Sequence, residues 1–207
     1  MLENNLIAIL LVMLSAIIGP ILVVKYKSYL EKKKKQEESR SISENFATNE
    51  LVEEELEKIK AHTGVNSLWI AQFHNGGKFY PNGKSITKFS ITYNYQNLQY
   101  PGISNTLNNI PVSLFNTSLS KLYKDKEILL PNFTEKNNYD LSPFNNNQKV
   151  KSFYLFALNS IKGDFVGFMG LEFTEKHQEI KEEQLEFLRN KSITIGAILS
   201  INYNKSK

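Results

Sequence analysis

The sequence contains no cysteine. This absence excludes disulfide bonds, thiolate zinc sites, lipid attachment through cysteine and cysteine nucleophiles. It fits a domain in a reducing compartment, where structural disulfides are rare. Any function must therefore rest on other side chains.

Histidine is also scarce, with three residues in a chain of 207. His62, His74 and His177 lie far apart in the sequence, and none belongs to the H-x-x-x-H pattern of a helical metal site. The carboxylates gather at 53–57 and 179–186, a pattern typical of solvated helix faces. We therefore expect no metal, no cofactor and no enzymatic activity. A hydrolase that uses His74 and a carboxylate is the catalytic alternative, but no recognisable motif supplies its nucleophile.

Glycine is limited to ten residues, and three of them lie in FHNGGKFYPNGKS (73–85). A phosphate-binding loop needs G-x-x-x-x-G-K-[ST] at the start of a helix. The interval from Gly77 to Gly83 is one residue too long, and the sequence after Ser85 alternates like a strand. The segment is therefore not a phosphate loop. Asn75-Gly76 and Asn82-Gly83 each predict a tight turn.

One long apolar run is present, from Leu6 to Val24, nineteen residues without a charge. As a helix it would span about 28 Å, close to the ~30 Å hydrocarbon core of a bilayer. A cleaved signal peptide would have a basic start and a shorter run, whereas this chain begins MLENN. We expect residues 1–24 to be a transmembrane anchor that contacts the lipid bilayer through residues 6–24.

Lysines follow this run at Lys25, Lys27 and Lys32–Lys35. Lysines beside a membrane span mark its cytoplasmic side. We expect a single-pass protein of the inner (cytoplasmic) membrane, with its N-terminus outside and the remaining chain in the cytosol. In this basic stalk, residues 25–44, Lys25 to Lys35 would contact anionic lipid headgroups. Nucleic-acid binding is the rival interpretation of such a run, and a tethered stalk makes it the weaker one.

The rest of the chain, residues 45–207, begins and ends with helical patterns. Apolar residues at helical spacing predict a helix over 47–64, with a cap at Thr48 or Asn49 and its end at Gly64. A second long helix is predicted over 179–203, and a shorter one over 112–127.

Four segments between these helices alternate with a period of two. The predicted strands form two pairs, 65–74 with 84–94 and 151–160 with 163–174, the second pair joined by a turn at Lys162-Gly163-Asp164. An α+β fold, with an antiparallel sheet and the terminal helices packed on one face, is the economical arrangement.

This order of elements, and the aromatic-rich second strand pair around its glycine turn, resembles a GAF domain, a small sensor fold related to PAS. The resemblance covers about residues 45–204. The segment FHNGGKFYPNGKSITKFSITY is also similar to a subgroup of GAF-like proteins of tailed phages and bacteria, which often carry an N-terminal membrane anchor. The N-[KR]…F-x-x-x-D-E pattern of cyclic-nucleotide-binding GAF domains is missing, as are the cysteines of methionine-sulfoxide-reducing ones.

Alternation divides the first two strands into an aromatic face and a polar face. Trp69, Ala71 and Phe73 share one face of the first strand, and the second strand continues it with Phe89, Ile91 and Tyr93. We expect this aromatic face to pack against the terminal helices. The opposite face gathers polar side chains, and a face turned to solvent would have the same pattern.

In a GAF domain, the face away from the terminal helices is the floor of the ligand pocket. The resemblance therefore implies a site for a small polar or anionic ligand. Its residues would be Gln72, His74, Lys88 and Ser90, with the backbone of Asn75, Gly76 and Gly77 at the rim.

We expect a membrane-anchored cytosolic module that senses a ligand or binds a partner, and that can form a homodimer through its terminal helices. The alternative is a phage-encoded interaction or interference protein at the host membrane, acting in lysis timing or superinfection exclusion, with a vestigial pocket.

Overall fold

The computed structural model describes residues 2–78, 85–96, 107–133, 140–141 and 150–203. Side chains are described in these ranges except at residues 2–20, 22, 23, 37–42, 77, 78, 85, 96, 202 and 203. The chain divides into two compact units, Met1–Ala47 and Thr48–Lys207. The second unit contains the sheet and the candidate site.

Helix α1 runs from Leu2 to Thr63 and is longer than predicted. The cap expected at Thr48 or Asn49 does not start a helix, because the backbone is already helical through the basic stalk. The predicted end is confirmed: Gly64 adopts φ +67°, and its N–H donates to the Lys60 carbonyl at 2.8 Å. A left-handed glycine after the last turn is a common helix terminator.

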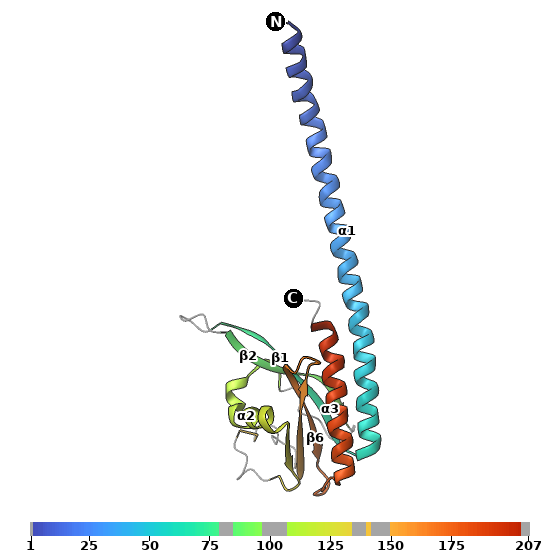
Figure 1. The fold of residues 1–207 in the computed structure, drawn as a ribbon, viewed down its shortest axis with the longest axis vertical. Coiled ribbons are helices and arrows are strands. Elements are labelled where there is room, and N and C mark those ends of the chain that lie inside the picture. The colour runs from blue at the N-terminus through green and yellow to red at the C-terminus, as the bar shows by residue number, and fades with distance from the viewer. Residues whose placement is uncertain (1, 79–84, 97–106, 134–139, 142–149, 204–207) are drawn as a thin grey trace. The chain divides into compact units, whose positions relative to one another are not determined.

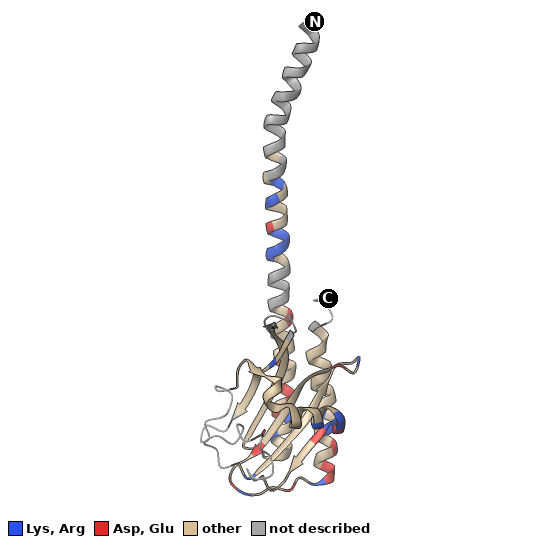
Figure 2. Cartoon of the chain, turned by 90° about the vertical axis from the view of Figure 1, so that its left-hand side faces the viewer, with Lys and Arg blue, Asp and Glu red and all other residues tan. Residues whose placement is uncertain are grey.

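Lys25, Lys27 and Lys32–Lys35 are exposed on α1 (Figure 2). Within the part of the chain whose side chains are described, no helix has a segment long and apolar enough to cross a membrane. The predicted span at 6–24 lies mostly outside that part, and the anchor stays a prediction.

The sheet has six antiparallel strands in the order β3-β2-β1-β6-β5-β4 (Figure 1). The strands are β1 Ser67–Lys78, β2 Ser85–Gln96, β3 Ile110–Pro111, β4 Glu127–Leu130, β5 Ser152–Asn159 and β6 Phe165–Phe173. The two predicted pairs are β1–β2 and β5–β6, and the turn between β5 and β6 is confirmed, with Gly163 at φ +88°. The short strands β3 and β4 were not predicted.

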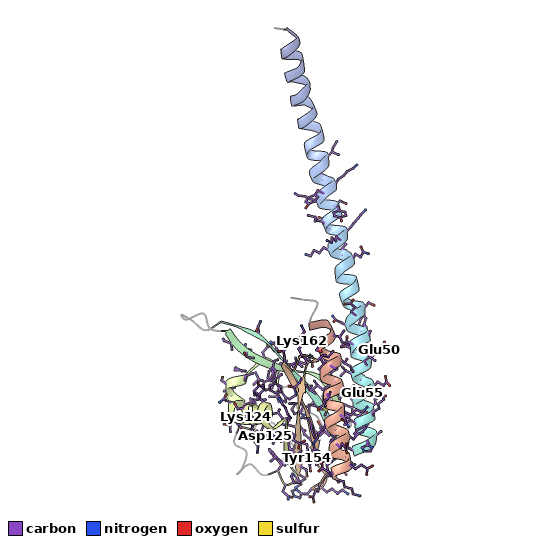
Figure 3. The ribbon with its side chains drawn as sticks, in the orientation of Figure 1. Glu50, Glu55, Lys124, Asp125, Tyr154 and Lys162 are labelled. Carbon is purple, nitrogen blue, oxygen red and sulfur yellow. The ribbon has the colours of Figure 1, made fainter. Side chains whose placement is uncertain are left out.

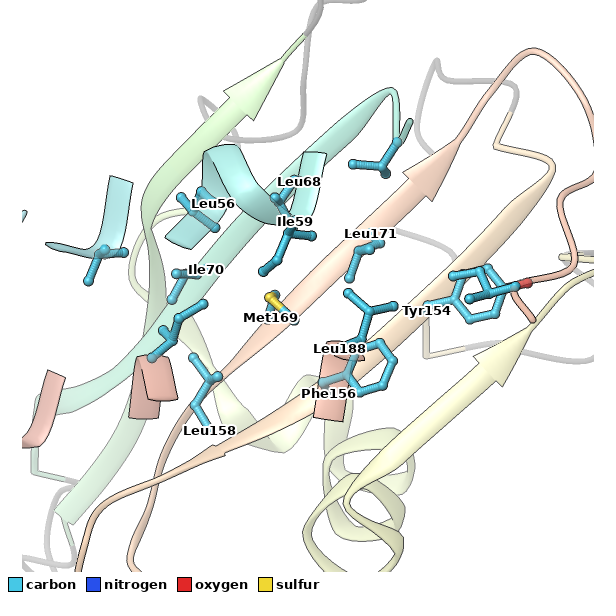
Figure 4. Packing of buried hydrophobic residues seen from close by; sticks show 14 of the residues in the cluster. Leu56, Ile59, Leu68, Ile70, Tyr154, Phe156, Leu158, Met169, Leu171 and Leu188 are labelled. Atoms are coloured by element: carbon cyan, nitrogen blue, oxygen red, sulfur yellow. The ribbon is translucent and has the colours of Figure 1, made fainter. Parts of the chain in front are cut away.

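On one face of the sheet, the end of α1 and helix α3, Glu182–Tyr203, form what we term the helix-side core (Figure 4). Val52, Leu56 and Ile59 of α1 and Leu188 and Ile195 of α3 contribute to it. From the strands, Leu68 and Ile70 of β1 lie beneath these helices together with Tyr154, Phe156, Leu158, Met169, Leu171 and Phe173. The terminal helices thus pack on one face, as predicted.

The other face carries a second core, which we term the loop-side core. It combines Trp69, Ala71, Phe89, Phe153 and Phe168 of the strands with residues of the section between β2 and β5. That section contains the 3-10 helix η2, Val112–Phe115, and helix α2, Asn116–Asp125. The aromatic face of β1 therefore packs away from the terminal helices, and our prediction of its orientation is wrong.

A bulge in β2 explains a further error. Ile70 pairs with Tyr93, but the next residue, Ala71, pairs with Ile91, so Thr92 is an extra residue. Ile91 packs at the loop-side core, whereas Tyr93 packs at the helix-side core. Phe89, Ile91 and Tyr93 were predicted to share a face, but the bulge places Phe89 and Ile91 on one face and Tyr93 on the other.

A second irregularity replaces one predicted turn. Asn75 pairs with Thr87 and Lys78 pairs with Ser85, so β1 continues through Gly76 and Gly77. Asn75-Gly76 is therefore part of a strand. The other predicted turn, Asn82-Gly83, lies outside the described residues.

Candidate functional site

The predicted site residues of the first strand pair do come together. His74 stands opposite Lys88 and Gln72 opposite Ser90 in the β1–β2 ladder. The His74 Nε2 and Ser90 Oγ atoms are hydrogen-bonded at 2.9 Å, and the Asn109 N–H donates to the same Ser90 Oγ at 2.9 Å. We refer to the side chains of Gln72, His74, Lys88 and Ser90 as the β1–β2 polar patch.

Two of the three predicted rim residues are described in some detail. Asn75 is exposed, and its carbonyl lies 3.4 Å from His74 Nδ1. The Lys88 side chain lies across Gly76, so closely that a Cβ there would be 2.4 Å from the Lys88 Cδ. Gly77 belongs to β1, but nothing beyond its backbone placement is described.

The β1–β2 polar patch is not the floor of a pocket under the loop section. Along β1, Gln72 and His74 continue the face of Leu68 and Ile70, and that face belongs to the helix-side core. The inferred location was wrong because the aromatic face was assigned to the wrong side. The ligand-binding role of these residues itself stays a prediction.

A cavity of about 380 Å³ lies on the opposite side, between α2 and the sheet, and we term it the α2 groove. The strands contribute Phe73, Thr87 and Phe165, and the chain before and within α2 contributes Val112, Asn116, Leu119, Ser120, Tyr123 and Lys124. Figure 3 shows Lys124 beside Asp125 on α2. None of the residues predicted as ligand-binding lines this groove.

Aromatic rings form its walls. The rings of Phe73 and Phe165 meet edge to face with centroids 4.8 Å apart, and Tyr123 lies 5.8 Å from Phe165. The Lys126 ammonium covers the Tyr123 ring at 4.9 Å. Polar side chains of Thr87, Asn116, Ser120 and Lys124 stand at the rim, and all four are exposed. Such a groove suits a flat apolar ligand with polar edges.

Asp140 holds the start of α2 in place. The backbone N–H and the hydroxyl of Ser118 donate to its two carboxylate oxygens at 2.7 and 2.6 Å. At the other end, the Lys126 N–H donates to the Leu122 carbonyl at 2.9 Å. The groove wall formed by α2 is therefore fixed at both ends.

Sequence reasoning missed the groove although its components were visible. Asn116, Leu119, Ser120 and Tyr123 follow the spacing of one helix face, and Phe73 belongs to the aromatic face of β1. Their meeting depends on which face of the sheet α2 covers. Alternation alone does not specify that choice.

A second feature that the sequence analysis passed over is a carboxyl group in the loop-side core. Glu172 of β6 is 0% exposed, and the Trp69 indole N–H donates to its Oε1 at 2.7 Å. Burial raises the pKa of Glu172 to about 8, against the lowering effect of its contacts with Trp69 and Ser67. One acidic residue within the apolar run FVGFMGLEF was the available signal. Among the described residues, no cluster of three or more His, Asp or Glu could hold a metal ion.

No family model matches the sequence, and no curated protein matches it. The structure is similar to solved GAF domains. A GAF domain of a Synechocystis protein in its photoproduct state aligns with a TM-score of 0.56 and 9% identity, over 77% of this chain and 97% of that one. The blue-light-absorbing form of a Thermosynechococcus elongatus GAF domain gives 0.55 and 12%, over 79% and 91%. A GAF domain/HD domain protein of Geobacter sulfurreducens gives 0.52 and 9%, over 74% and 92%. The fold is therefore GAF-like.

Proposed function

We propose that this protein is a sensory module that binds a small ligand in the α2 groove, and that it is not an enzyme. The observation that carries the proposal is the groove itself, an aromatic-walled cavity in a GAF-like fold. The structural neighbours include a cyanobacteriochrome photoreceptor, so the same fold serves sensing in other proteins. A ligand that contacts both α2 and the sheet is placed to change how they pack.

The groove favours a ligand with an aromatic body. Its volume of about 380 Å³ lies within the range of roughly 300–1,000 Å³ that is usual for small-molecule pockets. Phe73, Phe165 and Tyr123 offer ring faces and edges for stacking. The Lys124 ammonium at the rim would attract a negative charge on the ligand. An aromatic carboxylate combines an aromatic body with such a charge.

The test uses 2-naphthoate as the probe and the full-length chain in lipid nanodiscs, with binding measured by saturation-transfer NMR against empty nanodiscs. We expect Ser120→Phe, which fills the groove, to reduce probe affinity at least about tenfold, equivalent to about 1.4 kcal/mol. Thr117→Phe places the same ring at an exposed position of α2 that does not line the groove. This control is expected to bind like wild type.

The same probe shows whether the ligand binds in the α2 groove or at the β1–β2 polar patch. We expect His74→Ala and Lys88→Ala to leave probe binding unchanged, because neither residue lines the groove. Unchanged binding by Ser120→Phe would contradict the groove. Loss of binding in the His74 and Lys88 variants would mean that the probe binds at the β1–β2 polar patch instead.

We propose that residues 6–24 tether this module to the inner membrane, with the GAF-like domain in the cytosol. The uncharged run and the lysines that follow it support this placement. The full-length chain is expected to stay in the membrane pellet after alkaline carbonate extraction. Leu14→Arg with Ile17→Arg should release it, because two charges near the middle of a span oppose insertion. Release of the unsubstituted chain by carbonate would contradict the tether.

A further inference from the structure

Glu172 lies at the end of β6 with its carboxyl group enclosed in the loop-side core. In the sheet it stands opposite Ser67 of β1 and Phe153 of β5. The Phe133 ring packs against Phe153 with centroids 5.4 Å apart, and the side chain of Glu172 has no exposed surface. A charged residue type in this position needs an explanation, because carboxylates are rarely buried without a partner.

Only one of the two oxygens of the Glu172 carboxyl group has a hydrogen-bond partner in the described part of the chain. The Trp69 indole N–H donates to Oε1 at 2.7 Å, and Oε2 has no hydrogen-bond partner in the described part of the chain. Ser67 faces the same carboxyl and favours its charged form, but without the geometry of a full hydrogen bond. One indole donor is little compensation for an anion held away from water.

Among the residues that the structure describes, no cation contacts the Glu172 carboxyl group. From β1 the neighbours are Ser67 and Trp69, from β5 Phe153, and none of them ionises at ordinary pH. Lys151, Glu175, Lys176 and His177 are the described titratable residues that flank this end of the sheet along the chain; Lys151 is half-buried and the other three are exposed. None of these four residues contributes to the shift in the pKa of Glu172. The ion pairs found among the described residues do not include Glu172.

A neutral carboxylic acid fits this environment, and a carboxylate does not. An uncharged acid with one unpaired oxygen costs far less to bury than an anion. Once ionised, the group is stabilised most readily by water, and water can reach it only if the packing over this end of the sheet opens.

We propose that Glu172 and Trp69 form a proton switch in the loop-side core: Glu172 is protonated while the core is closed, and release of its proton to solvent opens the core to water. The O–H bond of the acid breaks, its electron pair stays on the carboxylate, and the proton passes to buffer. No other reactant is involved. The switch does not depend on a ligand in the α2 groove.

The single tryptophan of the chain makes the test direct, because all indole emission comes from Trp69. The full-length protein in phospholipid vesicles, which contain no other protein, is titrated from about pH 6 to about pH 10, and emission and melting temperature are recorded. We expect the emission to shift to longer wavelength in one transition centred near pH 8, and the melting temperature to fall by several degrees between about pH 6 and about pH 8. Glu172→Gln, which keeps an oxygen for the indole but cannot ionise, should show no transition. The control Glu175→Gln, at an exposed neighbouring carboxylate, should behave like wild type.

A transition that persists unchanged in Glu172→Gln would overturn the proposal, and so would its absence from wild type. Should Glu172→Gln fail to fold, infrared spectroscopy of the unsubstituted protein tests the same claim. The carbonyl-stretch band of a buried protonated carboxylic acid is expected at about pH 6 and should disappear by about pH 10. A spectrum without that band at the lower pH would also overturn the switch.

Discussion

The contact between Gly170 and Trp69 shows how closely the centre of the sheet is packed. Gly170 stands opposite Trp69 in the β1–β6 ladder. A Cβ on Gly170 would lie 2.2 Å from the Trp69 Cζ2 atom, far inside van der Waals contact. The indole that bonds Glu172 therefore occupies space that any other residue at position 170 would need.

We expect Gly170→Ala to lower the free energy of unfolding by about 1–3 kcal/mol, the usual effect of overpacking a core. The buried indole cannot move aside without disturbing Phe153 and Phe168, whose rings lie 6.3 and 5.8 Å from it. Urea denaturation of the two proteins measures the difference.

Gly76→Ala is the matched control, since it adds the same methyl group to a strand glycine. Its Cβ would also be close to a neighbour, 2.4 Å from the Lys88 Cδ, but that neighbour is a flexible side chain. The loss is expected to stay below about 1 kcal/mol. Equal losses in the two variants would contradict the role assigned to the indole.

The residue pattern predicted well which positions are buried. It predicted less well which face of the sheet each side chain occupies. Leu68, Ile70, Trp69 and Ala71 are all fully buried, so β1 has two apolar faces. A strand of this kind gives no sequence signal for which face meets the terminal helices. The β1–β2 polar patch was therefore assembled correctly from alternation but assigned to the wrong side, and the α2 groove was missed.

At the scale of single elements, the residue that ends α2 has a strained backbone conformation. Lys126 follows the helix with φ +69°, in the left-handed region that favours glycine. Its N–H closes the helix onto the Leu122 carbonyl, and its carbonyl accepts a hydrogen bond from the Ala157 N–H at 2.8 Å. The backbone conformation is thus required both to end α2 and to start β4.

Lys126→Gly is expected to raise the free energy of unfolding by about 0.5–1 kcal/mol, because it relieves this strain. Loss of the contact between the Lys126 ammonium and the Tyr123 ring will offset part of the gain. Thermal or urea denaturation provides the measurement.

The same substitution at an exposed position inside α2 should act in the opposite direction. Lys121→Gly is expected to lower the free energy of unfolding by about 1 kcal/mol, the usual effect of glycine within a helix. If both glycine variants are destabilised alike, the positive φ at Lys126 carries no strain.

Several elements marked by local signals were predicted, whereas the short strands and the bulge, which are defined only by their pairing, were not. The β5–β6 turn and the end of α1 follow from glycines, and α3 follows from its apolar spacing. The two-residue strand β3 and the four-residue strand β4 are too short to show a period. The bulge at Thr92 leaves the alternation KFSITYNY intact, so the sequence looks the same with and without it.

At the scale of the GAF-like domain, two buried carboxyl groups among the described residues respond to pH in opposite directions. Burial would raise the pKa of Glu55, but hydrogen bonds from Lys191 and Lys58 outweigh it and lower the pKa. Its stabilising effect is therefore present above the ordinary carboxyl pKa of 4.5 and is lost as the pH falls. Glu172 has a raised pKa, so its neutral form stabilises the fold at low pH, and that stability is lost between about 4.5 and about 8.

The free energy of unfolding is therefore expected to peak in mildly acidic solution, at about pH 5, and to decrease at lower and at higher pH. On the alkaline side, Glu172 contributes a slope of about 1.4 kcal/mol per pH unit. Urea denaturation at a series of pH values gives the curve. Glu55→Gln should flatten its acidic side, and Glu54→Gln, at an exposed carboxylate that bonds the same Lys58, should not. A peak at alkaline pH would contradict the assignment for Glu172, and an unchanged acidic side in Glu55→Gln would contradict the assignment for Glu55.

Apolar side chains on α3 support the predicted homodimer. Ile193 is 67% exposed and Ile201 is 50% exposed, and they lie eight residues apart along one side of the helix. We propose that two copies pair through this side of α3. Ile193→Lys with Ile201→Lys is then expected to give monomers in light scattering of the detergent-extracted protein. The control Ile161→Lys, at a hairpin turn with 73% exposure, should leave dimers intact. A monomeric unsubstituted chain would contradict the pairing.

The bulge at Thr92 makes β2 belong to two cores at once. Phe89 and Ile91 before it serve the loop-side core, and Tyr93 and Tyr95 after it pack at the helix-side core. Deleting Thr92 would restore a regular ladder and carry both tyrosines across the sheet, away from α1. Natural variants of this fold should therefore gain and lose residues freely in the surface turn after Gly163, yet keep the length of β2 around Thr92 constant.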